Sequence, residues 1–213
     1  MPFSTDPSVR VKPAEEYLFV VFTLPFGSYY AAPVDALVAE HHVRSFPGGT
    51  GSVKAAGNYS AALIADLEAR RQGCSIVMWL DGLHHKQIEE CGVMNVFFVL
   101  DDVVVTPSLN GTILPGVTRD SAITVLREMG FTVEERSLSI DEVVSAHERG
   151  TLRECFGTGT AATLTHVRRI RYRNRDFELP AVETQGIGTS VRKRLIEIAT
   201  GQIAEHREWL EIL

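Results

Sequence analysis

The sequence predicts a single domain of the α+β, or mixed α/β, class, and its length and its apolar runs carry this prediction. The chain has 213 residues, of which 45% are hydrophobic, enough for one compact domain with a substantial core. Short strand-like runs outnumber helical ones, and hairpin signals alternate with longer crossovers. Because no internal repeat, low-complexity segment or long linker interrupts the chain, we expect one domain over residues 1–213.

Most of the predicted strands are short apolar runs. Residues 17–23 read YLFVVFT, a β-branched and aromatic run that predicts a strand buried on both faces. Residues 93–99 and 103–106 predict two more strands, and Asp101-Asp102 between them is expected to form a hairpin turn. The remaining predicted strands cover residues 76–80, 132–137, 153–156 and 164–173.

Helices are predicted from apolar spacing and from end signals. Ser139 followed by Glu142 forms a capping box, which should open a helix that continues to about Arg149. Residues 60–72 are expected to form an amphipathic helix with an apolar face made of Ala61, Leu63, Ile64, Leu67 and Ala69. The other predicted helices cover residues 121–129 and 187–198, and glycines 73, 130 and 201 are expected to end helices.

The charge of the chain argues against nucleic acid as a partner. The formal net charge is −6, and no basic patch stands out. An alternation of cations with Ile170 and Tyr172 predicts the solvated face of an edge strand, where charge discourages pairing with another sheet. The arginines of this run are Arg168, Arg169, Arg171, Arg173 and Arg175.

Cysteine usage and the N-terminus predict a cytoplasmic protein without a metal site. Cys74, Cys91 and Cys155 are widely spaced and form no CxxC pair, which suits free thiols in a reducing compartment. No clustered ligands with zinc spacing occur. The N-terminus is polar, and no apolar run approaches the roughly 20 residues that cross a bilayer, so neither a secretory signal nor a membrane partner is expected.

Lys54 lies in the glycine-rich stretch GGTGSVKAAGNY, residues 48–59. Clustered glycines usually mark a backbone that approaches something closely or adopts a positive φ. A lysine held inward between two such turns would be desolvated, and its amine could then attack an aldehyde. The alternative is a surface turn with a solvated lysine, and the spacing alone favours this alternative.

Three further segments have residues suited to binding an anionic ligand with a ring. Glu89 and Glu90 precede a predicted strand, where a carboxylate could hold a cationic ring nitrogen, although an exposed acidic turn is the commoner structure. The stretch LPGVTRDS leads into a helix that Thr118 or Asp120 could cap, and free N–H groups at its start could seat a phosphate. The stretch FGTGTA could donate to an anion or form a tight turn.

In this order the segments resemble the large domain of the branched-chain amino acid aminotransferases, which are class IV, or fold-type IV, pyridoxal-phosphate enzymes. The resemblance begins near Glu16 and continues to the C-terminus, where residues 201–209 are similar to the family's last segment. Several motifs in matching order are far more specific than one glycine motif. The matching segments are GGTGSVKAAGNY, GCSIVMWLDG, IEECGVMNVFFV, NGTILPGVTRDS and CFGTGTAA.

The resemblance implies pyridoxal 5′-phosphate as the cofactor and assigns roles to residues around its ring. Lys54 would bind the cofactor covalently and act as the acid and base that moves a proton to and from the substrate. Glu90 would face the pyridine nitrogen and keep it protonated. Tyr59 would hydrogen-bond the phenolic oxygen of the ring.

The resemblance also implies how the anionic groups would be held. Val117 and Thr118 would offer backbone N–H groups to the cofactor phosphate, and Thr160 would add another donor. Ala161 would offer its backbone N–H to the substrate carboxylate. Val93 stands near that carboxylate, where the family usually has threonine or serine.

The chain departs from the family pattern in its first part and at single positions. It has no counterpart to the small domain that precedes the large one in the family, and residues 1–15 are expected to be the remnant of the interdomain segment. Without that domain the site would be open on one side, so water would weaken its electrostatic contacts. Ala56 and His166 replace a usual glycine and a usual proline, which are milder changes.

The expected activity is pyridoxal-phosphate-dependent transfer of an amino group from a branched-chain or other aliphatic amino acid to a 2-oxo acid. One alternative is a lyase, decarboxylase or racemase on the same scaffold. Another is a truncated, non-catalytic relative that binds the cofactor and depends on a separate small-domain partner. A homodimer is the default assembly, and Tyr29, Tyr30 and Phe46 are the candidates for apolar surface that seeks a partner.

Overall fold

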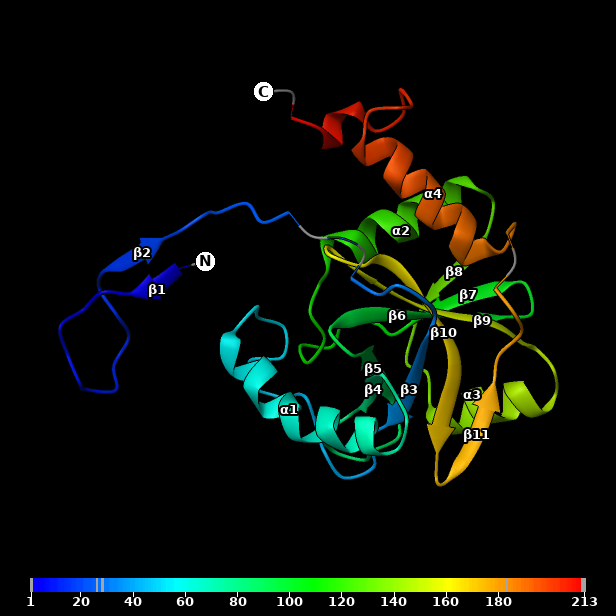
Figure 1. The fold of residues 1–213 in the computed structure, drawn as a ribbon, viewed down its shortest axis with the longest axis horizontal. Helices are drawn as coiled ribbons and strands as arrows, with labels where there is room; N and C mark the ends of the chain where they lie inside the picture. The colour runs from blue at the N-terminus through cyan, green and yellow to red at the C-terminus, as the bar shows by residue number, and fades with distance from the viewer. Residues whose placement is uncertain (1, 26, 28, 183, 212–213) are drawn as a thin grey trace.

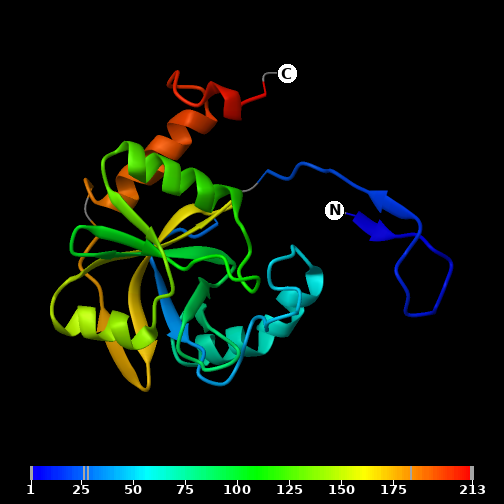
Figure 2. The same ribbon diagram turned by 180° about the vertical axis from the view of Figure 1, so that it is seen from behind.

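The computed structural model describes residues 2–25, 27, 29–182 and 184–211. In these residues the chain forms a nine-stranded sheet, with helices around it, and a separate two-stranded sheet near the N-terminus (Figures 1 and 2). The mixed α/β domain predicted from the sequence is confirmed. Across the same residues, no helix has the length and apolar character needed to cross a membrane.

The large sheet closes into a ring because one of its strands pairs with two partners. Its strands are β3 (Val34–Val38), β4 (Ile76–Leu80), β5 (Ile88–Cys91), β6 (Met94–Leu100), β7 (Val103–Thr106), β8 (Thr132–Glu135), β9 (Leu152–Gly159), β10 (Thr163–Tyr172) and β11 (Arg175–Glu178). They follow the order β11-β10-β3-β4-β5-β6-β7-β8, and β9 pairs with both β10 and β6. Strands β10, β3, β4, β5, β6 and β9 therefore form a barrel, which β11, β7 and β8 extend.

Helices cover the outside of this barrel in separate places. The helices are α1 (Ala56–Arg71), α2 (Val117–Glu128), α3 (Ile140–Glu148) and α4 (Ile187–Ala199), followed by a short 3₁₀ turn at Arg207–Trp209. Helices α2 and α4 pack against each other on one side of the sheet, and α1 packs against β4 (Figure 1). The α2–α4 pair covers one apolar cluster on the outer face of the strands, and α1 covers another.

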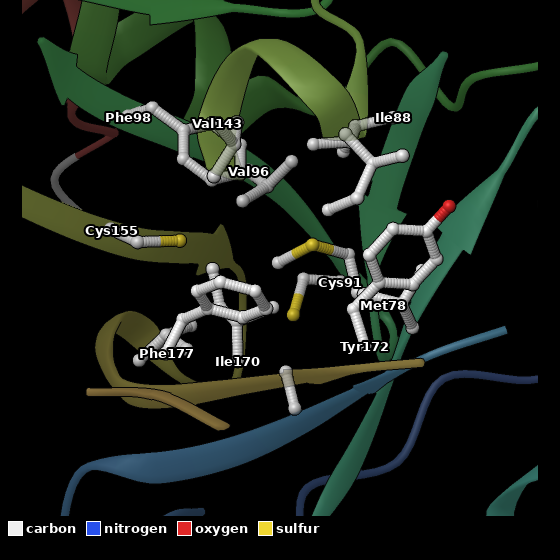
Figure 3. Packing of buried hydrophobic residues seen from close by; sticks show 14 of the residues in the cluster. Met78, Ile88, Cys91, Val96, Phe98, Val143, Cys155, Ile170, Tyr172 and Phe177 are labelled. Carbon is white, nitrogen blue, oxygen red and sulfur yellow. The ribbon is translucent and has the colours of Figure 1, made fainter. Parts of the chain in front are cut away.

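The main apolar core lies between the strands of the barrel and α3. Side chains from β4, β5, β6, β9, β10 and β11 point toward one another there, and Val143 of α3 joins them (Figure 3). The fully buried members include Met78, Ile88, Cys91 and Phe98. At about 25 cal/mol per Å² of buried apolar area, this core supplies the main driving force that holds β5 in place.

Several local predictions are confirmed almost residue for residue. Strands β4 and β7 occupy the predicted ranges, and Asp101 turns between β6 and β7 with a φ of 50°. Ser139 caps α3, because its hydroxyl accepts a hydrogen bond from the Glu142 N–H at 3.1 Å. These elements follow from contacts between near neighbours, which a sequence pattern records directly.

The predicted buried strand at residues 17–23 is wrong. Only Tyr17–Phe19 form a strand, β2, and it pairs with β1 (Pro2–Ser4) alone. Its side chains are exposed, with Phe19 at 68%. Figures 1 and 2 show this hairpin at the end of an arm that extends away from the barrel, so no second element covers it.

The helix α1 is present, but its predicted apolar face is right only at Ala69. Ala65 and Ala69 are buried against Val77 and Trp79 of β4. Leu63, Ile64 and Leu67 are exposed, at 59%, 66% and 54%. The sheet accepts the small side chains because they let the helix approach closely, and the larger ones point outward.

The arginine-rich run does not form an edge strand. It falls mainly in β10, which pairs with β11, with β3 and with β9. Arg168 and Arg169 form ion pairs with Asp35 of β3 at 2.6 and 3.1 Å, and Arg171 pairs with Asp176 of β11 at 2.8 Å. The arginines therefore link neighbouring strands through ion pairs. The edge strand next to β10 in the strand order is β11.

Candidate active site

Glu89 and Glu90 are buried in β5, at 2% and 4% exposure, so an exposed acidic turn is excluded. Glu90 lies opposite Trp79 of β4 and Asn95 of β6 in the strand register. Its carboxylate accepts a hydrogen bond from the Leu114 N–H at 2.8 Å. The sequence predicted that this carboxylate could point at a ligand, and the sheet holds it at a fixed place.

Burial raises the pKa of Glu90 to about 7, against the opposing effects of Arg44 and the Leu114 N–H. The guanidinium of Arg44 lies 3.2 Å from the Glu90 carboxylate. Burial also raises the pKa of Glu89, whose carboxylate accepts a hydrogen bond from the Thr112 hydroxyl. A carboxylate that titrates near neutrality in a cleft is a typical feature of functional sites.

A cleft lies directly over Glu90. Tyr59 from α1, Val93 from the β5–β6 turn and Leu114 from the segment before α2 line it together with Glu90. Three of the residues expected at the cofactor and substrate, namely Tyr59, Glu90 and Val93, therefore meet in one depression. Arg44 and Trp79 form part of its floor, and the Trp79 indole N–H donates to the Gly92 carbonyl at 3.0 Å.

Lys54 lies at the rim of this cleft and not inside it. Its side chain is exposed, so the expectation of an inward, desolvated lysine is not met. Its Nζ lies 5.1 Å from the centroid of the Tyr59 ring, within cation–π range, and its charge acts on the Glu90 carboxylate. A lysine in this place can reach over the cleft from the same loop that contributes Val53.

Asn58 and Gly51, two residues to which the sequence assigned no role, shape the lysine loop. The Asn58 amide donates to the carbonyls of Thr50 and Val53, at 2.8 and 2.9 Å, which ties α1 to the turn before Lys54. Gly51 packs so closely against Ser45 and the Thr112 carbonyl that a Cβ there would overlap both. The glycine cluster thus serves close approach of the backbone, one of the two uses that its composition predicted.

The start of α2 has no side-chain cap, so the prediction that Thr118 or Asp120 caps it is wrong. The N-cap is Gly116, in an extended conformation, and no side chain hydrogen-bonds the first turn. The Asn95 amide donates to the Leu114 carbonyl at 2.8 Å, and its oxygen occupies the space that a Cβ on Gly116 would need. The first N–H groups of α2, those of Val117 and Thr118 among them, therefore have no capping side chain among the described residues.

The turn after β9 lies beside the β5–β6 turn. Thr158 of β9 is paired with Asn95 of β6, and the Cα of Gly159 lies next to Val93 and Met94. Thr160 and Ala161 follow in an exposed turn. The three predicted anion-binding positions, at the start of α2, at Thr160 and at Ala161, are therefore brought toward one end of the barrel.

Arg44 and Asn95 are the residues that the sequence interpretation missed. Arg44 has no recognisable motif, because its partners Glu90 and Thr112 are far away in the chain. Asn95 carried a usable signal, since an amide inside an apolar strand needs buried hydrogen-bond partners. Among the described residues, no group of three or more His, Cys, Asp or Glu could hold a metal ion.

Comparison with known proteins identifies the family. The model of the amino-transferase class IV family matches residues 4–170. The chain belongs to this family. A probable branched-chain-amino-acid aminotransferase from Streptomyces coelicolor is 41% identical over 99% of this chain, and a branched-chain-amino-acid aminotransferase from Mycobacterium tuberculosis is 40% identical over 98%. The chain spans only 59% and 58% of the lengths of these two relatives.

Solved structures of class IV aminotransferases share the fold. The Escherichia coli branched-chain amino acid aminotransferase is 29% identical, with a TM-score of 0.70 over 84% of this chain and 57% of its own. The Thermobaculum terrenum enzyme, solved in its PLP form, is 26% identical with a TM-score of 0.72 over 84% of this chain and 55% of its own. A Thermoproteus uzoniensis enzyme with norvaline superimposes over 99% of this chain, with a TM-score of 0.81 at 23% identity, which bears on the fold alone.

Proposed function

We propose that this class IV aminotransferase chain binds pyridoxal 5′-phosphate at Lys54 and transfers the amino group of a branched-chain or other aliphatic amino acid to a 2-oxo acid. The observation that carries the proposal is Glu90, a buried carboxylate paired with Arg44 beneath a cleft that Tyr59 lines and Lys54 borders. Relatives named branched-chain-amino-acid aminotransferases, at about 40% identity, support the substrate class.

The residues present fit the cofactor on three counts. A pyridinium nitrogen needs an anionic partner away from water, and Glu90 is 4% exposed with one hydrogen bond to the Leu114 N–H. A phosphate needs free N–H donors, and the uncapped start of α2 provides them. An aldehyde needs a primary amine nearby, and Lys54 lies beside Tyr59 at the rim of the cleft.

In the proposed mechanism each residue has a separate task. The cofactor supplies an electron sink for the bonds at the substrate Cα. Lys54 Nζ would take the proton from the substrate Cα and deliver it to C4′ of the cofactor, since its amine is free once the substrate has taken its place. Glu90 holds the proton on the ring nitrogen, and Tyr59 orients the ring. The Ala161 N–H and the surface of Val93 would meet the substrate carboxylate.

The Lys54→Ala variant tests the covalent role of the lysine. Wild-type protein mixed with pyridoxal 5′-phosphate and borohydride should carry a permanent adduct on the peptide that contains Lys54, detected by mass spectrometry. Lys54→Ala should lose both the adduct and the visible absorbance band, because the remaining lysines lie elsewhere. Lys193→Ala on α4 is the matched control and should keep both. An adduct that persists on another lysine in Lys54→Ala contradicts the assignment.

Val93 favours a second candidate reaction, a lyase, decarboxylase or racemase reaction on the same scaffold. Its isopropyl side chain is 43% exposed in the cleft and offers no hydroxyl to a substrate carboxylate. Adding leucine to the loaded protein distinguishes the two. Transamination should convert the bound cofactor to its pyridoxamine form, seen as loss of the visible band, whereas the other reactions should leave the band unchanged.

We propose further that the active assembly is a homodimer, or a complex with a separately made small-domain partner, in the cytoplasm. The apolar arm, with Phe19 and Phe22 exposed at 68% and 71%, supports an assembly. The three cysteines are buried and unpaired, which suits a reducing compartment. Sedimentation of the pure chain should give twice the monomer mass if the homodimer forms alone.

A further inference from the structure

Arg44 holds a buried position at the meeting point of three segments. It lies in the loop between β3 and α1, and its side chain is only 9% exposed. Its guanidinium donates to the carbonyl of Gly51, at 3.3 and 3.4 Å, and to the carbonyl of Thr112. It also forms an ion pair with Glu90, whose side chain is 5% exposed. One cation therefore contacts the lysine loop, the segment before α2, and β5.

The surroundings of Glu90 make this cation hard to replace. Beside the Arg44 guanidinium, the groups that act on the Glu90 carboxylate are the Leu114 N–H, the neighbouring Glu89 and the more distant, exposed Lys54. Burial and Glu89 both favour the neutral acid. If Arg44 lost its charge, one backbone N–H and one solvated amine would have to stabilise the buried anion.

The same guanidinium also fixes the distance between the lysine loop and the segment before α2. The Thr112 carbonyl receives Arg44 and the Ser45 hydroxyl, the latter at 2.9 Å, and Gly51 packs against the same carbonyl. Ser45 shares this carbonyl with Arg44 but has no bond to Glu90. The chain thus offers a matched pair of side chains that differ in their contact with the carboxylate.

We propose that Arg44 is a positioning residue that keeps Glu90 an anion at the base of the cleft and holds the Lys54 loop against the segment before α2. In this role it acts through Glu90, with which it forms an ion pair. The proposal rests on the proposed function for its purpose, because an anionic Glu90 is what a protonated ring nitrogen requires.

The first test measures Glu90 itself, in protein without cofactor. The carboxyl signal of Glu90 in ¹³C-glutamate-labelled protein, assigned by its loss in Glu90→Gln, is followed through pH 5–9. In Arg44→Met the protonation midpoint should rise by about one pH unit or more, the usual effect of losing an adjacent opposite charge. Ser45→Ala should leave the protonation midpoint of Glu90 unchanged, and Arg44→Lys should keep it close to the wild-type value. An unmoved midpoint in Arg44→Met overturns the proposal.

The second test asks whether Arg44 acts through Glu90. Affinity for pyridoxal 5′-phosphate, measured by its absorbance, should fall at least about tenfold in Arg44→Met. In a Glu90→Gln background, Arg44→Met should lower the affinity much less. An equal loss of affinity in both backgrounds would indicate a merely structural role and would overturn the proposal. Should Arg44→Met not fold, Arg44→Gln, which can still donate to the Thr112 carbonyl, carries the same expectations. If the wild type binds no cofactor, the proposed function fails, while the midpoint test still decides the link between Arg44 and Glu90.

Discussion

At the scale of single residues, the candidate site centres on Glu90, a carboxylate whose ionisation costs free energy because the fold buries it. Glu90 is held by strand pairing in β5, so it cannot turn toward water to lower that cost. Arg44 and the Leu114 N–H compensate part of it. The site therefore keeps a titratable anion near neutral pH, ready for a cationic ligand.

Glu90 should make the stability of the cofactor-free protein depend on pH. Burial raises its pKa from 4.5 to about 7, so the native carboxyl binds its proton more tightly than the unfolded one. The unfolded state holds fewer protons between these values, and the free energy of unfolding should fall as pH rises through them and then level off. Relative to Glu90→Gln, the wild type should lose on the order of 3 kcal/mol in urea unfolding over that window. Glu16→Gln on the exposed arm should leave the slope unchanged, and equal slopes in wild type and Glu90→Gln would contradict the assignment.

The sequence predicted part of the site at this scale. The resemblance placed Tyr59, Glu90 and Val93 around one ligand, and the three residues line one cleft. The strand β5 that carries Glu90 was not predicted. Arg44 was missed since its role depends on contacts across the sheet. Lys54 is exposed, as in the surface turn that its spacing alone favoured. Glycine spacing shows that a backbone comes close without showing which way a side chain points.

At the scale of elements, the close contact between the lysine loop and the segment before α2 depends on a missing Cβ. Gly51→Ala should force the Thr112 carbonyl and Ser45 apart, and we expect a loss of about 1–3 kcal/mol in the free energy of unfolding. Gly57→Ala in α1 is the control, because nothing lies within 4 Å of its added methyl. It should be neutral or stabilise by up to about 1 kcal/mol. Equal effects in urea unfolding would exclude close packing as the reason for Gly51.

Helix α1 shows why element positions were easier to predict than element faces. Its range follows from helix-forming residues and from Gly73, which adopts a φ of +72° just after the end. Its orientation follows from the surface it meets: the sheet near Trp79 packs against the small residues Ala65 and Ala69, with Ala62 partly buried beside them. Apolar spacing favoured Leu63 and Leu67, since the periodicity of a helix carries no information about the shape of its partner.

At the scale of the whole molecule, the barrel and the arm differ in how they are stabilised. The barrel has a continuous buried core, whereas the arm is a short hairpin with exposed apolar side chains. The resemblance to a longer family predicted the mixed α/β class of this domain correctly. It gave no guide to residues 17–23, most of which are exposed in this structure.

Deleting residues 1–24 should therefore leave the barrel intact. We expect the free energy of unfolding in urea to change by less than about 0.5 kcal/mol, because the removed side chains are mostly exposed. A chain shortened further, to remove β3, is the control and should fail to fold, since β3 joins β10 to β4. A loss of several kcal/mol on removing the arm alone would mean that it packs against the barrel or against a second chain in solution.

The closure of the barrel has a consequence for the order in which the chain can mature during synthesis. Strand β10 pairs Val167 with Val34 of β3, and β9 pairs Thr158 with Asn95 of β6. The lysine loop, Glu90 and the start of α2 all leave the ribosome before these late strands, so the nascent chain holds most of the ligand-binding groups on an open, unclosed sheet. Pairings so distant in sequence form slowly. The cofactor should therefore bind only after the last barrel strand has been translated. A chain released before residue 172 should bind chaperones.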